Sequence, residues 1–177
     1  MKNIIFTAVF ASFLATTPLV SASLPTTQTD EQRLVNKIRH ELVTLPFYGV
    51  FDNMSFSLDG RKVILHGQVT RPVLSSSAAN VVKRIVGVEE VDNQIEVLPL
   101  SPNDDRLRIA VYRTIFSQAS LGRYTLGAIP PVRILVKNGD VTLAGVVINE
   151  MDKNLAGLFA NQVAGVFSVT NQLTVEK

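Results

Sequence analysis

The stretch VILHGQV, residues 63–69, decides the fold, because the same pattern returns as VTLAGVV at residues 141–147. Both copies read V-x-L-x-G-x-V and place apolar residues on alternate positions, which is the period of a half-buried β-strand. The glycine at the third inward position, Gly67 or Gly145, indicates that another part of the chain packs closely over that point of the sheet.

Each copy is the second strand of a predicted hairpin. A turn signal precedes it, DGRK at residues 59–62 and KNGD at residues 137–140, and an earlier alternating run ends at each turn. The apolar positions of these earlier runs are Met54, Phe56 and Leu58 in the first copy, and Val132, Ile134 and Val136 in the second.

The two copies lie 78 residues apart, and this offset holds without a gap from Met54/Val132 to Val97/Val175. Eleven of these 44 aligned pairs are identical, which indicates a duplicated domain. Each copy has about 70 residues, near the lower limit for a self-sufficient hydrophobic core. We therefore expect the two modules to lean on each other.

Helices flank each hairpin. In the first copy we expect a helix from about Glu31 to Leu45 capped by Asp30, a second helix from Pro72 that ends at Gly87, and a last strand from Val88 to Leu98. The second copy repeats this order, with Asn149 capping its long helix. The sequence thus predicts an α+β fold of two tandem αββαβ modules, each a three-stranded mixed sheet packed against two helices. The predicted boundaries are residues 1–22 for a signal peptide, 23–29 for a flexible tail, 30–98 for the first module, 99–103 for a linker and 104–176 for the second module.

The N-terminus has the pattern of a secretory signal peptide. Lys2 is followed by an apolar run at residues 4–14 and by the small-residue cleavage signal Val20-Ser21-Ala22. We expect cleavage after Ala22 and a periplasmic or secreted location. The absence of cysteine suits an exported protein that is held together by packing alone. It excludes thiol catalysis and a cysteine zinc site, and a lipoprotein anchor is not expected.

The order and spacing of these motifs resemble the BON domain family. The residues that carry the resemblance are the V-x-L-x-G-x-V strand and a later G-V-x-x-V-x-N-x-[LIV] run, at residues 87–95 and again at residues 165–173. The resemblance implies an exported bacterial envelope protein linked to osmotic and envelope stress, with no enzymatic signature. It also implies that association with phospholipid is to be expected, in some members through the long helix of the second module.

The chain carries no constellation that points to catalysis. His40 and His66 are isolated, and the repeat replaces His66 by Ala144. Carboxylates gather at predicted helix starts, where the helix dipole favours them. We expect no enzyme, no cofactor and no metal site. Nucleic acid is not expected as a partner either, because three arginines on one helix are balanced by neighbouring aspartates and read as a solvated face; these are Arg106, Arg108 and Arg113.

The two long helices differ in a way that points to a binding surface. Val73, Ser77 and Asn80 in the first become Met151, Leu155 and Leu158 in the second, a second apolar stripe beside the core stripe. Such a stripe needs a partner outside the module. The first module or a second subunit covers it, or it contacts lipid or a client chain.

A loop at residues 117–131 is five residues longer than its counterpart in the first module, and we expect it at the surface. It carries Leu121, Arg123, Tyr124 and Leu126. A tyrosine beside an arginine suits a membrane interface, where the ring sits at the headgroup level and the cation meets anionic lipid. The net charge of +2, or +1 after cleavage, makes electrostatic binding alone weak.

The sequence therefore favours a non-catalytic envelope protein whose second module binds anionic phospholipid or a membrane-associated envelope protein. The candidate binding residues are Met151, Leu155, Leu158, Leu121, Arg123, Tyr124 and Leu126. Two alternatives remain open. One is a soluble periplasmic stress or chaperone-like protein that holds client chains on the same stripe. The other is a self-association module that forms a weak homo-oligomer.

Overall fold

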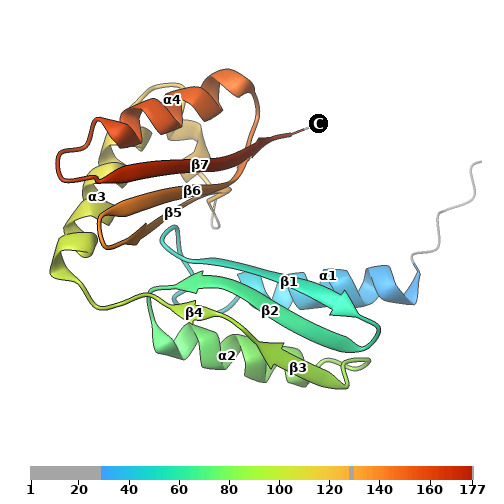
Figure 1. The fold of residues 1–177 in the computed structure, drawn as a ribbon. Helices are drawn as coiled ribbons and strands as arrows, with labels where there is room; N and C mark the ends of the chain where they lie inside the picture. The colour runs from blue at the N-terminus through green and yellow to red at the C-terminus, as the bar shows by residue number, and fades with distance from the viewer. Residues whose placement is uncertain (1–28, 128–129, 177) are drawn as a thin grey trace, which may run out of the picture.

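The computed structural model describes residues 29–127 and 130–176. The predicted signal peptide and residues 23–28 of the predicted tail lie outside the described residues. Two α+β modules follow each other with the element order αββαβ, as the repeat predicts (Figure 1). Within the described part of the chain, no helix combines the length and the apolar character that crossing a membrane requires.

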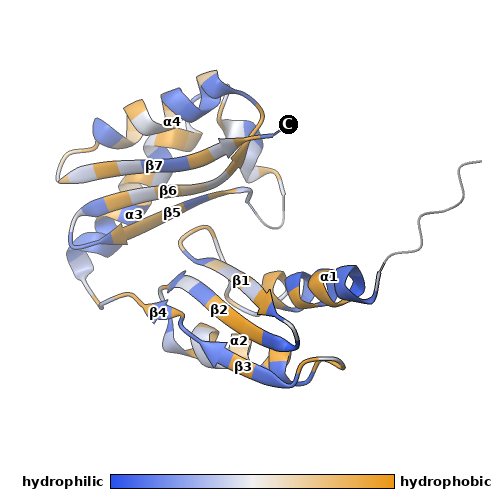
Figure 2. Cartoon of the chain, turned by 45° about the vertical axis from the view of Figure 1, so that its right-hand side comes forward, coloured by the Kyte–Doolittle hydropathy of each residue, from blue (hydrophilic) through white to orange (hydrophobic). Residues whose placement is uncertain are grey.

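The first module contains α1 (Asp30–Val43), β1 (Asn53–Asp59), β2 (Lys62–Val69), α2 (Pro72–Lys83), β3 (Glu90–Asn93) and β4 (Glu96–Val97). The second contains α3 (Pro102–Phe116), the 3-10 turn η1 (Gly122–Thr125), β5 (Val132–Lys137), β6 (Asp140–Val147), α4 (Glu150–Asn161) and β7 (Ser168–Val175). In both sheets the central strand pairs antiparallel with the first strand of its hairpin and parallel with the last strand of the module. The apolar centres of β2 and β5 are visible as orange stretches in Figure 2.

Some predicted boundaries differ from the structure. Thr29, not Asp30, caps α1, in a capping box with Gln32. Helix α3 begins at Pro102, before the predicted module boundary, because the Ser101 hydroxyl accepts from the Asp104 amide and caps it there. The predicted strand from Val88 to Leu98 is split into β3 and β4.

A local hydrogen bond accompanies the split in this strand but does not by itself cause it. The side-chain oxygen of Asn93 accepts from the amide of Ile95 at 3.2 Å. Beyond the split, Leu98 is buried and Val97 is exposed. Asn171 makes the equivalent bond to the amide of Leu173 at 3.2 Å, and there β7 remains paired with β6 throughout.

The repeated glycines are close-approach points, as predicted. A Cβ on Gly67 would lie 2.1 Å from the carbonyl oxygen of Asn53, and one on Gly145 would lie 1.9 Å from that of Pro131. Both glycines have a positive φ, 120° and 115°. The neighbour is the backbone at the start of the adjacent strand, so only glycine fits these two positions without displacing it.

The two modules lean on each other, as expected. Residues 49–51, which we call the capping segment, leave the first module and lie along the free edge of β5. The amide of Ile134 donates to the carbonyl oxygen of Val50 at 2.8 Å. The ring of Phe51 packs edge-to-face on Tyr112 of α3, with centroids 6.2 Å apart. The capping segment therefore completes both the sheet edge and the core of the second module.

Arg133 of β5 holds the modules together from the other side of the strand. Its guanidinium carbon lies 4.6 Å from the ring centroid of Tyr48, and it donates to the carbonyl oxygen of Gly49 at 3.1 Å. Leu135 and Ala144 also point away from the helices of their module, yet both are buried. In Figure 1 the two sheets are turned toward each other, with α4 above and α2 below, which explains this burial.

Candidate functional site

Helix α4 presents exposed apolar side chains on the side of the second module that faces away from the first. Met151 is 71% exposed and Leu158 is 53% exposed, while Leu155 is half-buried against the core of its own module. Cover by the first module is thus excluded for Met151 and Leu158, because that module lies against the opposite face of the sheet. Leu155 is mainly a packing residue.

Two further apolar side chains belong to the same end of the module. Ile148 immediately precedes the Asn149 cap of α4, and Leu126 follows η1; they are 53% and 85% exposed. We refer to Leu126, Ile148, Met151 and Leu158 as the α4 apolar surface. Scattered exposed apolar residues are normal on a soluble domain, whereas three around one helix start, with Leu158 two turns further along the helix, indicate an interaction surface.

The expectation that Leu121 and Tyr124 lie at the surface is wrong, because both are buried in the core of the second module. The Tyr124 hydroxyl donates to a carboxylate oxygen of Asp152 at 2.5 Å and accepts from the amide of Ile148 at 2.9 Å. In the first module the amide of Thr70, equivalent to that of Ile148, donates to Asp52 instead, at 2.7 Å. The longer loop of the second module thus supplies Tyr124 as the acceptor for this amide, whereas in the first module the acceptor is Asp52.

Asp152 is the centre of a buried polar network at the start of α4. It occupies the position of the core residue Leu74 in the first module, so its charge needs partners. The guanidinium of Arg123 and the hydroxyl of Tyr124 provide them, and the amide of Asp152 donates to Asn149 at 2.8 Å. This network fastens η1 to α4 and sets the position of Leu126.

The network also shifts the pKa values of Tyr124 and Arg123. Burial raises the pKa of the Tyr124 hydroxyl, and the hydrogen bond to Asp152 raises it further, so the hydroxyl stays a donor at neutral pH. The hydrogen bond to Asp152 raises the pKa of Arg123. The charge of Arg123 is therefore compensated by Asp152, and this arginine acts mainly as a loop anchor.

The cations of α3 are better placed for an external partner. Arg106, Ile109 and Arg113 follow each other at i, i+3 and i+7, and all three are exposed. Neither of the two arginines forms an ion pair with a residue in the described ranges. Arg108 is different, and its predicted solvated position is wrong. It is buried, pairs with Asp105 and donates to the carbonyl oxygen of Val136 at 2.8 Å.

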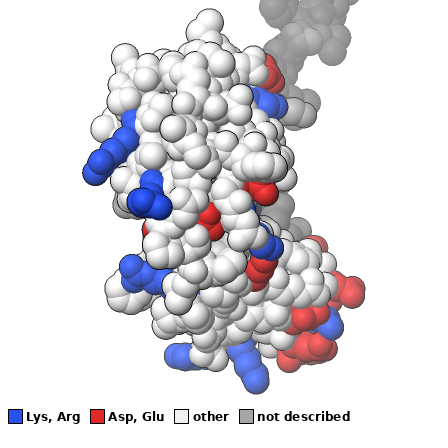
Figure 3. All heavy atoms as spheres, turned by 60° about the vertical axis from the view of Figure 1, so that its left-hand side comes forward, with Lys and Arg blue, Asp and Glu red and all other residues white. Residues whose placement is uncertain are grey.

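Helices α3 and α4 cover the same face of their sheet, so the second module joins the two kinds of side chain on its helical side. On the face drawn in Figure 3, the upper, second module is mostly uncharged with basic side chains toward its edge, whereas acidic side chains gather on the first module. Exposed apolar side chains and exposed cations thus lie on the same side of the second module. Among residues 29–127 and 130–176 there is no group of histidine and carboxylate side chains suited to a metal ion.

The first module is less tightly closed than the second. Asp104 at the start of α3 accepts from the amides of Asn138 and Gly139 at 2.9 and 3.0 Å, which fastens this helix to the β5–β6 turn. The equivalent residue of α1 is Glu31, which is exposed and whose side chain makes no hydrogen bond within the described part of the chain. Val35 stands where Arg108 reaches β5. Helix α1 therefore lacks both fastenings.

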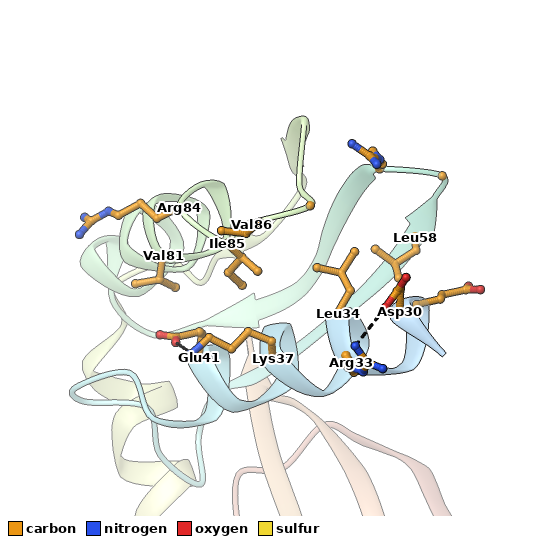
Figure 4. Close-up of a pocket in the computed structure, with 14 residues that line it drawn as sticks. Asp30, Arg33, Leu34, Lys37, Glu41, Leu58, Val81, Arg84, Ile85 and Val86 are labelled. Carbon is orange, nitrogen blue, oxygen red and sulfur yellow. Dashed lines mark ion pairs between the residues drawn. The ribbon is translucent and has the colours of Figure 1, made fainter. Parts of the chain in front are cut away.

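Two hollows consequently flank α1. The larger, of about 1180 Å³, lies between α1, the β1–β2 turn and the end of α2 (Figure 4). Leu34 and Leu58 approach each other across it, and its charged rim is partly neutralised by the pair of Arg33 and Asp30 at 3.2 Å. The smaller, of about 480 Å³, lies on the other side of α1, along the edge of β1.

Comparisons with known proteins agree with this architecture. The BON domain model matches residues 52–99 and 118–177, more than half of the chain, so this tandem αββαβ protein belongs to the BON domain family. No curated protein matches the chain.

Two solved structures of CdsD, a structural protein of the type III secretion system of Chlamydia trachomatis, are distantly similar. The first, its C-terminal domain, is 15% identical with a TM-score of 0.30 over 85% of this chain and 100% of that one. The second is 15% identical with a TM-score of 0.29 over 81% and 92%.

Proposed function

We propose that this chain is a non-catalytic envelope protein whose second module binds the surface of an anionic phospholipid membrane. The observation that carries the proposal is the α4 apolar surface, four large side chains that the first module leaves exposed on the same helical side of the second module as the exposed arginines of α3. Membership of the BON domain family supports a binding role. The signal-peptide pattern at residues 1–22 supports export to the periplasm or beyond.

The energetic balance favours shallow insertion assisted by charge. A fully buried Leu, Ile or Met side chain contributes about 1.5–3 kcal/mol, so partial insertion of four such residues contributes several kcal/mol. Each cation near an anionic surface adds about 1 kcal/mol. Arg106 and Arg113 together therefore account for about a thirtyfold change in affinity. Salt that screens them weakens binding without abolishing it.

The test is co-sedimentation of residues 23–177 with vesicles of neutral phospholipid and with vesicles that contain an anionic phospholipid, at low and at high salt. We expect pelleting with the anionic vesicles, reduced by salt. The double variant Met151→Ser with Leu158→Ser loses at least tenfold in affinity and keeps its stability, because both side chains are exposed.

The matched control is Val73→Ser, which removes an exposed apolar side chain from the equivalent helix position of the first module. It should leave vesicle binding unchanged. Absence of pelleting under every condition, or equal losses in the control and in the double variant, refutes the proposal. The variant Arg106→Gln with Arg113→Gln then separates charge from insertion, because it should remove the salt dependence and retain residual binding.

A further inference from the structure

The second module shows what a filled strand edge looks like in this fold. The amide of Ile134 on β5 donates to the capping segment, whose Val50 and Phe51 side chains pack on the core between β5 and α3. The segment is short and apolar, and it comes from outside the module. It forms a turn in which the amide of Asp52 donates to the carbonyl oxygen of Gly49 at 3.1 Å. It seals an edge that would otherwise present unpaired backbone groups to solvent.

The equivalent edge in the first module is not covered by any of the residues that the structure describes. Phe56 corresponds to Ile134 at the offset of 78, and the strand registers agree, with Phe56 opposite Leu65 and Ile134 opposite Leu143. The amide of Phe56 therefore points away from β2, as that of Ile134 points away from β6. Among the described residues it has no backbone partner on that side.

A pocket of about 480 Å³ lies at this edge, between β1 and α1. Its apolar wall is formed by Val35, Leu42, Tyr48, Met54, Phe56 and Leu58. Arg39 lies in its rim, at the helix position where Tyr112 meets the ring of Phe51 in the second module. The pocket thus occupies the place that Phe51 fills on the other copy.

Burial of the two edge strands shows the same difference. The inward residues of β5 are fully buried, whereas the equivalent residues of β1, Met54, Phe56 and Leu58, are half-buried. The missing fastenings of α1 account for the gap, because no side chain of that helix reaches β1 as Arg108 reaches β5. The core of the first module is therefore closed only when something lies along the edge of β1.

We infer that the pocket between α1 and β1 binds a short apolar turn of another polypeptide, seated on the edge of β1 as the capping segment is seated on β5. The outward amide of Phe56 offers a backbone hydrogen bond beside an apolar wall, and a peptide satisfies both, whereas an acyl chain satisfies only the wall. A small residue, a branched residue and an aromatic residue in succession reproduce Gly49, Val50 and Phe51. The guanidinium of Arg39 would cover the aromatic ring.

The probe follows from the molecule itself. A blocked peptide with the sequence of residues 47–53, FYGVFDN, is titrated into residues 23–177 labelled with nitrogen-15, and amide shifts are followed. We expect saturable binding with the largest shift at the Phe56 amide and little change at the Ile134 amide, whose site is already filled. Replacing the second phenylalanine of the peptide by serine should weaken binding at least tenfold, without any change to the protein.

Two protein variants complete the test. Val35→Trp fills the pocket and should weaken peptide binding at least tenfold; its thermal unfolding midpoint shows whether the fold survives. Asn80→Trp adds the same side chain to the exposed face of α2 and should bind the peptide as the unmodified protein does. An unmoved Phe56 amide, a shift at Ile134 instead, or undiminished binding by a folded Val35→Trp variant overturns the inference.

Discussion

In the second module, α3 is fastened to its sheet by Asp104 and Arg108, and the edge of β5 is covered by the capping segment. In the first module, Glu31 and Val35 occupy the two helix positions, and no segment within residues 29–127 and 130–176 covers the edge of β1. One repeated pattern has thus produced one closed and one open copy. The difference teaches that strand alternation and turns set the topology of this fold, whereas a few side chains on the first helix decide whether its core is sealed.

The largest effects should come from substitutions of the glycine that both modules have in their central strand. Gly145→Ala places a Cβ against the Pro131 carbonyl at a positive φ, and Gly67→Ala does the same against Asn53. We expect each substitution to cost about 3 kcal/mol of unfolding free energy in urea titrations, through backbone strain and displacement of the neighbouring strand. A cost below about 1 kcal/mol in either copy would mean that the strand start moves aside easily.

The next largest effect should distinguish the second module from the first. Asp104→Ala leaves the buried amides of Asn138 and Gly139 without their carboxylate partner, which we expect to cost about 2 kcal/mol. Glu31→Ala, the matched change in α1, should lie within about 0.5 kcal/mol of the unmodified protein. Urea unfolding of the two variants measures the contrast, and similar costs would contradict the difference in fastening.

A smaller effect is expected from substitutions at the junction between the modules. Arg133→Ala removes the contact with the Tyr48 ring and leaves the Gly49 carbonyl without its donor, for a cost of about 1–2 kcal/mol. Lys137→Ala removes an exposed ion pair with Glu96 across the same junction and should cost less than about 0.5 kcal/mol. Thermal unfolding ranks the two, and the reverse order would show that the junction depends on surface charge.

The smallest effect concerns pH. Hydrogen bonds from Lys137, and secondarily from Gln68, lower the pKa of the Glu96 carboxyl in the folded chain. A lowered folded-state pKa stabilises the protein above the unfolded-state value of about 4.3, and this contribution is lost as the pH falls through the lowered value. Lys137→Ala should therefore reduce the loss of stability on acidification slightly. An unchanged pH profile of the unfolding midpoint would contradict this coupling.

The topology was predictable because the same pattern of alternation and turns occurs twice in the chain. Alternation ends at each turn, and the glycines at residues 67 and 145 mark the close approaches that the structure shows. The two buried charged residues could have been recognised from the alignment of the copies, because each of them aligns with an apolar residue. Arg108 aligns with Val35, and Asp152 aligns with the buried Leu74, so an apolar residue occupies each position in the first copy.

The loop at residues 117–131 was harder to predict, because apolar residues in a loop fit the surface and the core equally well. One signal was available: Pro130 aligns with Asp52, so the second module lacks the carboxylate that accepts from Thr70. The amide of Ile148 needed another acceptor, and Tyr124 provides it. The capping segment was equally hidden, because contact between modules leaves no local period in the sequence.

The origin of the capping segment has a consequence for synthesis. A chain emerges from its N-terminus onward, whether from the ribosome or from a secretion pore, so residues 49–51 are available before the strand that they cover. When β5 emerges, the partner for its free edge is already in place, and the nascent second module has little time in which to pair with a neighbouring chain. Cutting the gene between the copies would deprive the second module of the capping segment and leave a fragment that is prone to aggregate. The first module would lose no such segment.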